Sequence, residues 1–215
     1  MHLAHLLVAL MVGSKRKKNQ STLSAWYASL YTRRVDLVGD YAGAELFLVE
    51  GDSLLLEAFS DPLLDFGENA FQLLHAVYSV EKLLRQLSSR GCNFHIAFFD
   101  DHRHLCIPGA VVEEKQKQKY LLARAAIVRH LQCNAGKTVT TIHSFSSIDH
   151  PSFLRYLYDA GCYFVLCHDG TGGQAVEPYQ WMIHWLAQNG WNVALINGME
   201  CHDTKVCATV TISRH

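Results

Sequence analysis

Short apolar runs, each closed by a polar turn, constrain the fold of this chain more than any other feature. Four of them occupy residues 45–50, 93–99, 163–167 and 192–196. Apolar runs of this length without polar alternation are typical of strands that are buried on both faces, as they are in a parallel sheet. A weaker strand is predicted at residues 139–142.

Segments with a helical period of apolar residues separate these runs. The clearest lies between the first two runs, at residues 69–87, and others cover residues 21–38, 113–130, 150–160 and 179–189. A strand, a helix and a strand joined by short turns form a right-handed unit with parallel, adjacent strands. We therefore predict an α/β, three-layer, doubly wound fold with a mostly parallel central sheet.

The chain is predicted to form one domain, residues 21–215, behind a flexible leader, residues 1–20. In the leader the apolar stretch precedes the basic residues 15–18, which is the reverse of a secretory signal, and it is too short to span a bilayer. The seven scattered cysteines contain no CxxC pair and indicate reduced thiols in an intracellular protein. We expect no membrane span.

The overall charge does not indicate a nucleic-acid-binding protein. The formal net charge is −1, from 19 basic and 20 acidic residues. An RNA contact must therefore use a local patch. Three aromatic residues, Tyr179, Trp181 and Trp185, could stack on bases, although aromatic residues at this helical spacing are more often part of a buried core.

Aspartates follow three of the predicted strands, at Asp52, at Asp100 and Asp101, and at Asp169. The carboxyl ends of parallel strands meet at one edge of a sheet, where functional groups gather. Carboxylates that converge there favour Mg²⁺ or Mn²⁺, and two such ions support phosphodiester hydrolysis. The same residues are also ordinary turn and helix-capping residues, so both interpretations remain open.

Four segments of the chain, residues 40–54, 93–104, 163–170 and 191–198, carry a resemblance to a known family. They resemble the N-terminal PIN-like region of superkiller-type DExD/H-box RNA helicases, of the antiviral, interferon-inducible kind, and of their fungal relatives. The resemblance covers residues 26–212. It implies a PIN-like fold, a cytoplasmic setting, and RNA, a helicase core or another protein as partner.

The resemblance also bears on catalysis. In active PIN nucleases the metal ligands lie at strand ends, and Asp52, Asp100 and Asp169 match those places, with Asp101 beside them as a further catalytic candidate. The acid that a helix normally adds is not evident, and Glu81 and Glu113 are the candidates. The sequence contains no DExD/H box, so no ATPase activity is expected of it. We therefore predict an accessory domain that binds RNA or docks on a helicase, with a metal-dependent ribonuclease as the alternative.

Overall fold

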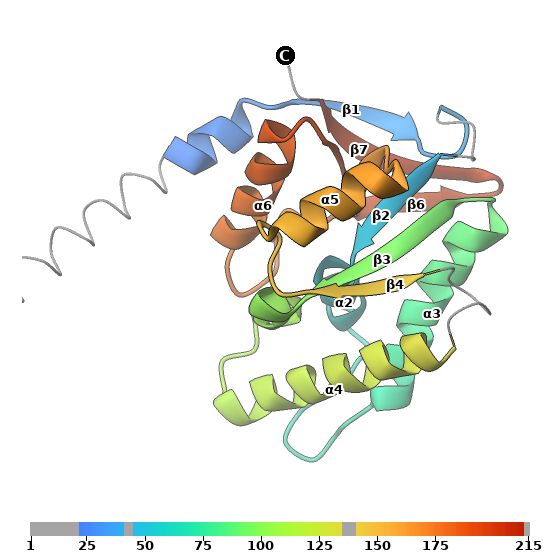
Figure 1. Cartoon of the computed structure of the whole chain (residues 1–215). Helices are drawn as coiled ribbons and strands as arrows, with labels where there is room; N and C mark the ends of the chain where they lie inside the picture. Colours follow the sequence, from blue (N-terminus) through green and yellow to red (C-terminus); the bar gives the residue numbers. More distant parts are fainter. Residues whose placement is uncertain (1–21, 41–44, 135–140, 213–215) are drawn as a thin grey trace, which may run out of the picture.

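A seven-stranded sheet lies between two layers of helices in the computed structural model (Figure 1). The structure describes residues 22–40, 45–134 and 141–212, so the predicted leader lies outside the described residues. The strand order is β1-β7-β6-β5-β2-β3-β4. The strands are β1 Tyr31–Asp36, β2 Leu46–Glu50, β3 Asn93–Phe99, β4 Ile142–Phe145, β5 Phe164–Cys167, β6 Asn192–His202 and β7 Lys205–Ile212.

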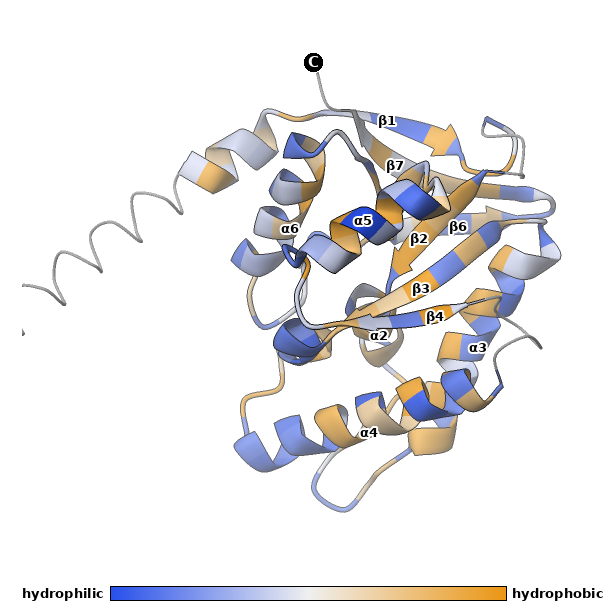
Figure 2. Ribbon diagram, in the orientation of Figure 1, coloured by the Kyte–Doolittle hydropathy of each residue, from blue (hydrophilic) through white to orange (hydrophobic). Residues whose placement is uncertain are grey.

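The five strands from β4 to β6 are parallel to one another, and β7 and β1 add an antiparallel extension. The predicted α/β fold with a mostly parallel sheet is therefore confirmed. Figure 2 shows β2, in the middle of the sheet, as hydrophobic along most of its length, and the edge strand β1 as largely hydrophilic. The difference follows from burial, because β2 is covered on both faces whereas most of β1 is exposed.

Helices α3 and α4 cover one face of the sheet, helices α5 and α6 cover the other, and α2 begins where β2 ends (Figure 1). Each face has its own core of buried apolar side chains. None of the helices in the described part of the chain is both long and apolar enough to cross a membrane. The helices are residues 22–28, α2 Gly51–Phe59, α3 Leu73–Ser89, α4 Glu114–Cys133, α5 Pro151–Ala160 and α6 Glu177–Gln188, with a 3₁₀ helix, η1, at Asp100–Cys106.

Three details of the predicted secondary structure differ from the structure. The helix predicted for residues 21–38 ends at residue 28, and Tyr31–Asp36 forms the edge strand β1. The first four residues of β1 are exposed, so the strand lacks the alternation of buried and exposed residues that identifies a half-buried strand. The hairpin of β6 and β7 was not predicted, and β4 begins at Ile142, where the predicted strand ends.

The sheet reverses its direction of growth between β2 and β5. From β2 the chain builds β3 and β4 on one side, and it then returns to build β5 and β6 on the other. In such sheets the crevice outside the carboxyl ends of the two strands is the usual ligand site. At this point Gly51 joins β2 to α2, and a Cβ there would lie 2.3 Å from the ring of Phe98. Only glycine therefore fits this turn.

The loop between α2 and α3 is held by one ammonium group. Lys119 of α4 donates hydrogen bonds to the carbonyl oxygens of Gly67, Glu68 and Ala70. We expect Lys119→Met to lower the free energy of unfolding by about 1–2 kcal/mol, because three carbonyls lose a charged donor at a partly exposed site. Urea denaturation measures this change. An equal loss in Lys115→Met, at an exposed position one turn earlier, would contradict the assignment.

Candidate functional site

The strands that carry the predicted aspartates are neighbours. β5, β2 and β3 lie side by side and parallel, so Asp169, Asp52 and Asp100 follow them at the same edge of the sheet. The predicted adjacency of these strand ends is therefore present in the structure. The surroundings of the carboxylates differ from one residue to the next.

Asp52 is fully buried and is bound by an arginine. Both of its carboxylate oxygens accept hydrogen bonds from Arg124 of α4, from Nε at 2.6 Å and from a terminal nitrogen at 2.9 Å. The same guanidinium donates to the carbonyl of Phe99 at 3.2 Å. Burial raises the pKa of Asp52, the guanidinium opposes that shift, and the carboxylate in turn raises the pKa of Arg124. The ion pair therefore occupies both oxygens of this side chain.

Asp169 is bound by groups of the protein as well. Its carboxylate accepts hydrogen bonds from the hydroxyl of Tyr27 at 3.2 Å and from the backbone N–H of Thr171 at 2.9 Å. Burial favours the neutral form, but the hydrogen bonds from Thr171 outweigh it and lower the pKa of Asp169. Burial, and then the charge of Asp169, raise the pKa of Tyr27. The helix at residues 22–28 is thereby joined to the end of β5.

Asp100 and Asp101 begin η1, and both are exposed. The backbone N–H of Asp101 donates to the carbonyl of Ser146 at 3.0 Å. Glu81 and Glu113, the two candidates for the additional acid of the metal site, do not lie with these aspartates. Glu81 accepts from His130 at 2.8 Å and from Arg85 at 3.3 Å, and Glu113 lines a pocket beside Lys119.

The residues present do not fit a divalent-metal site. Across residues 22–40, 45–134 and 141–212, no group of three or more His, Cys, Asp or Glu side chains is placed to hold a metal ion. Mg²⁺ and Mn²⁺ require oxygen ligands, and both oxygens of Asp52 are bound to Arg124. Two roles stay predictions: metal binding by Asp52, Asp100 and Asp169, and catalysis by these three residues together with Asp101.

Glu50 is a buried acid at this edge that was not among the predicted site residues. It is the last residue of β2, and its carboxylate caps α2 by accepting the N–H groups of Asp52 at 3.1 Å and Ser53 at 2.6 Å. Burial first, and the charge of Asp52 second, raise the pKa of Glu50 to about 7. An acid directly before the first residue of a helix is a capping signal that could have identified it.

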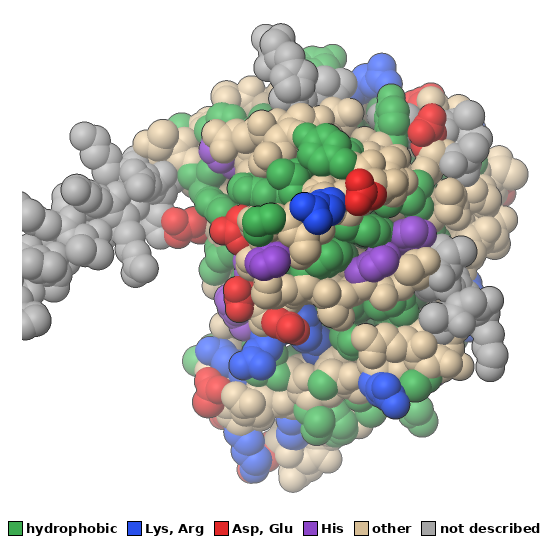
Figure 3. Space-filling model, viewed as in Figure 1, with side chains coloured by type: hydrophobic (Ala, Val, Ile, Leu, Met, Phe, Trp, Pro, Cys, Tyr) green, Lys and Arg blue, Asp and Glu red, His purple; other side chains and the backbone are tan. Residues whose placement is uncertain are grey.

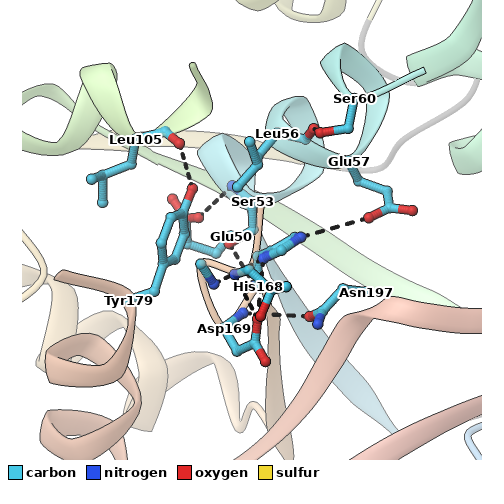
Figure 4. Close-up of polar contacts among 12 residues, drawn as sticks. Glu50, Ser53, Leu56, Glu57, Ser60, Leu105, His168, Asp169, Tyr179 and Asn197 are labelled. Atoms are coloured by element: carbon cyan, nitrogen blue, oxygen red, sulfur yellow. Dashed lines mark hydrogen bonds and ion pairs between the residues drawn. The ribbon is translucent and has the colours of Figure 1, made fainter. Parts of the chain in front are cut away.

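His168 was also not selected among the site residues. It follows β5, and its side chain is almost completely buried. Figure 4 shows its ring near the carboxylates of Glu57 and Asp169. Its Nδ1 accepts a hydrogen bond from the backbone N–H of Gly170 at 2.9 Å, so the proton of the neutral ring is on Nε2. Nε2 lies 3.7 Å from a carboxylate oxygen of Glu57. Burial lowers the pKa of His168, with Asp169 opposing. The backbone N–H of His168 donates to the hydroxyl of Ser53 at 2.8 Å, which joins β5 to α2.

The polar groups at the switch point therefore bind one another. Ion pairs and hydrogen bonds connect Arg124 with Asp52, Glu50 with the start of α2, and Tyr27 with Asp169. Satisfied networks of this kind rigidify the structure around them. The geometry is typical of a structural role more than of a set of groups ready to activate water.

An aromatic groove lies between the helix at residues 22–28 and α6. It has a volume of about 500 Å³ and is lined by Thr22, Leu23, Trp26, Glu177, Trp181, His184 and Gln188. The ring of Trp26 meets His184 edge to face at 4.5 Å, and Trp181 is 37% exposed. Of the three aromatic residues proposed to stack on bases, Tyr179 and Trp185 pack in the core, and Trp181 lines this groove.

Comparison with known proteins agrees with this architecture. A family model described as the PIN-like domain of the ATP-dependent RNA helicase DDX60 matches residues 22–215. A human protein described as a probable ATP-dependent RNA helicase DDX60-like is 29% identical over 169 residues, which cover 76% of this chain. The chain spans 9% of the length of that relative. No solved structure matches the chain.

Proposed function

This chain belongs to the family of PIN-like domains of the ATP-dependent RNA helicase DDX60, and we propose that it is a non-motor accessory domain that binds single-stranded RNA. The proposal includes a cytoplasmic location. A role in docking on a helicase core is the other function that family membership suggests.

The aromatic groove is the observation that carries the RNA proposal. Trp181, which is 37% exposed, lines this groove beside Trp26 and His184, and each nucleobase has a face that can stack on such a ring. Stacking does not require a strongly positive protein. On the face shown in Figure 3, Lys and Arg side chains are interspersed with Asp and Glu, in accord with the net charge of −1. Base stacking is therefore a better source of affinity than phosphate contacts.

The contacts at the switch point favour binding over cleavage. Asp52 is held by Arg124, and Asp169 is held by Tyr27, so neither carboxylate is presented to a metal ion or to RNA without rearrangement. Freeing Asp52 would leave two charges without partners in a buried setting, which costs several kcal/mol. We therefore derive no cleavage step for this chain.

Removing the exposed indole tests the proposal. Trp181→Ala should weaken binding of a fluorescently labelled single-stranded RNA by roughly fivefold or more, because stacking contributes about 1–3 kcal/mol per base. Fluorescence anisotropy measures the affinity. Tyr158→Ala is the matched control, since Tyr158 is 61% exposed on α5 and does not line the groove.

Each outcome of this experiment decides between functions. RNA binding that Trp181→Ala leaves unchanged would overturn the groove assignment, and no RNA binding at all would favour docking on a helicase core. The same RNA incubated with Mn²⁺ tests the ribonuclease alternative. Cleavage that is lost in Asp100→Asn, and in Asp52→Asn when that variant keeps the native circular dichroism spectrum, would replace the accessory-domain proposal.

A further inference from the structure

Four large apolar side chains are exposed on α3 and on the loop before it. They are Leu74 (84% exposed), Leu63 (74%), Tyr78 (56%) and Phe71 (39%), and we call them the α3 patch. Leu74 and Tyr78 are four residues apart on α3, so they lie on one face of the helix. Exposed apolar side chains are ordinary when scattered, but a group of them on one element indicates an interaction surface.

The α3 patch borders a groove of about 360 Å³ between α2 and α3. Leu63 and Tyr78 line this groove, so the patch and the groove form one surface. The groove also contains charges of both signs. Glu57 and Asp61 lie on its α2 side, and Lys82 lies on its α3 side.

These charges are suited to interaction with other molecules. Glu57 has a side chain that is 42% exposed, and Lys82 is exposed. The carboxylate of Asp61 accepts hydrogen bonds from His75 at 3.0 Å and from the backbone N–H of Leu63. Both bonds lower the pKa of Asp61, so this carboxylate is ionised at neutral pH. The surface therefore combines apolar side chains with an acidic side and a basic side.

We propose that the α3 patch is the contact surface between two copies of this chain, related by a two-fold axis. In a two-fold contact the same surface meets itself, so Lys82 of each copy can face Glu57 or Asp61 of the other while Leu74 and Tyr78 pack at the centre. A surface with opposite charges on its two sides is complementary to its own copy.

The overall charge of the chain is consistent with self-association. Its net charge of −1 provides little repulsion between copies. The α3 patch shares no residue with the aromatic groove, so this inference is independent of the RNA proposal.

Sedimentation equilibrium of the full chain tests the dimer. The expected result is a mass that rises from monomer to dimer with concentration. Leu74→Glu or Tyr78→Glu should weaken the dimer by at least roughly 30-fold, because both copies lose a central apolar anchor and gain a buried charge. Both residues are more than half exposed, so the variants should keep the native circular dichroism spectrum. Leu122→Glu is the matched control, since Leu122 is 59% exposed but lies on α4.

A charge exchange tests the orientation of the two copies. Lys82→Glu and Glu57→Lys should each weaken self-association, because like charges then face one another in both contacts. A mixture of the two variants should restore the dimer, because each pair between the two different copies again joins opposite charges. A chain that stays monomeric at every concentration overturns the proposal. So does a dimer that Leu74→Glu leaves intact, or that Leu122→Glu weakens equally.

Discussion

Arg124→Met should lower the free energy of unfolding by about 3–5 kcal/mol. Methionine keeps much of the apolar volume of the side chain but leaves the carboxylate of Asp52 buried without a counter-charge. The loss should shrink as the pH is lowered toward the ordinary pKa of a carboxyl group, because the isolated carboxylate is then neutralised by a proton. Urea denaturation at several pH values measures both effects.

The double variant Asp52→Asn with Arg124→Met provides the control for this experiment. Removing both charges should recover most of the lost stability, because neither charge is left alone in the core. Arg129→Met, at an exposed position on the same helix, should change the stability little. If Arg124→Met and Arg129→Met have equal effects, the Asp52–Arg124 pair does not stabilise the fold.

Glu50 should make the protein less stable as the pH rises from mildly acidic to neutral. Its pKa is raised from 4.5 to about 7 by burial and by Asp52. Below the pKa that Glu50 has in the unfolded chain, the carboxyl group is protonated in both states. Between this pKa and the higher pKa of the folded chain, the unfolded state releases the proton while the folded state keeps it. Stability should therefore fall as the pH rises through this window and then level off. At roughly 1.36 kcal/mol for each pKa unit, the total fall is at most about 3.4 kcal/mol.

Glu50→Gln isolates this contribution from the other titrating groups. The amide cannot titrate, so the difference in stability between the native chain and the variant should change with pH in the window between the two pKa values. The amide has one acceptor oxygen, so one of the two capping N–H groups loses its partner, at a constant cost of about 1 kcal/mol. Equal pH profiles for the two proteins would contradict the raised pKa.

The strands buried on both faces were predictable from the sequence, and the antiparallel extension was not recognised. β2, β3 and β5 are continuous apolar runs, because covering helices require apolar residues on both faces. β1 carries no such pattern. Its Arg33 and Arg34 are exposed at the sheet edge, where charged side chains hinder further strand pairing. Pairing of β1 with β7 depends on contacts between distant parts of the chain, which periodicity does not contain.

The site was less predictable than the sheet for a related reason. Strand ends alone indicated that Asp52, Asp100 and Asp169 follow neighbouring strands. The partner of each carboxylate comes from elsewhere in the sequence. Arg124 is 72 residues from Asp52, and Tyr27 is 142 residues from Asp169. An acid with such a partner has the same local sequence as an acid that binds a metal ion.

The pairing of β1 with β7 has a consequence for synthesis on the ribosome. Tyr31 lies opposite Ile212, so among the described residues the first strand is hydrogen-bonded to the last. β2, β3 and β4 can pair much earlier, whereas β1 must wait for β7 with its backbone groups open to other chains. Premature termination before Lys205 would therefore yield a nascent product that retains its central strands but leaves the apolar strand β6 unpaired at its edge, where it is prone to pair with other chains.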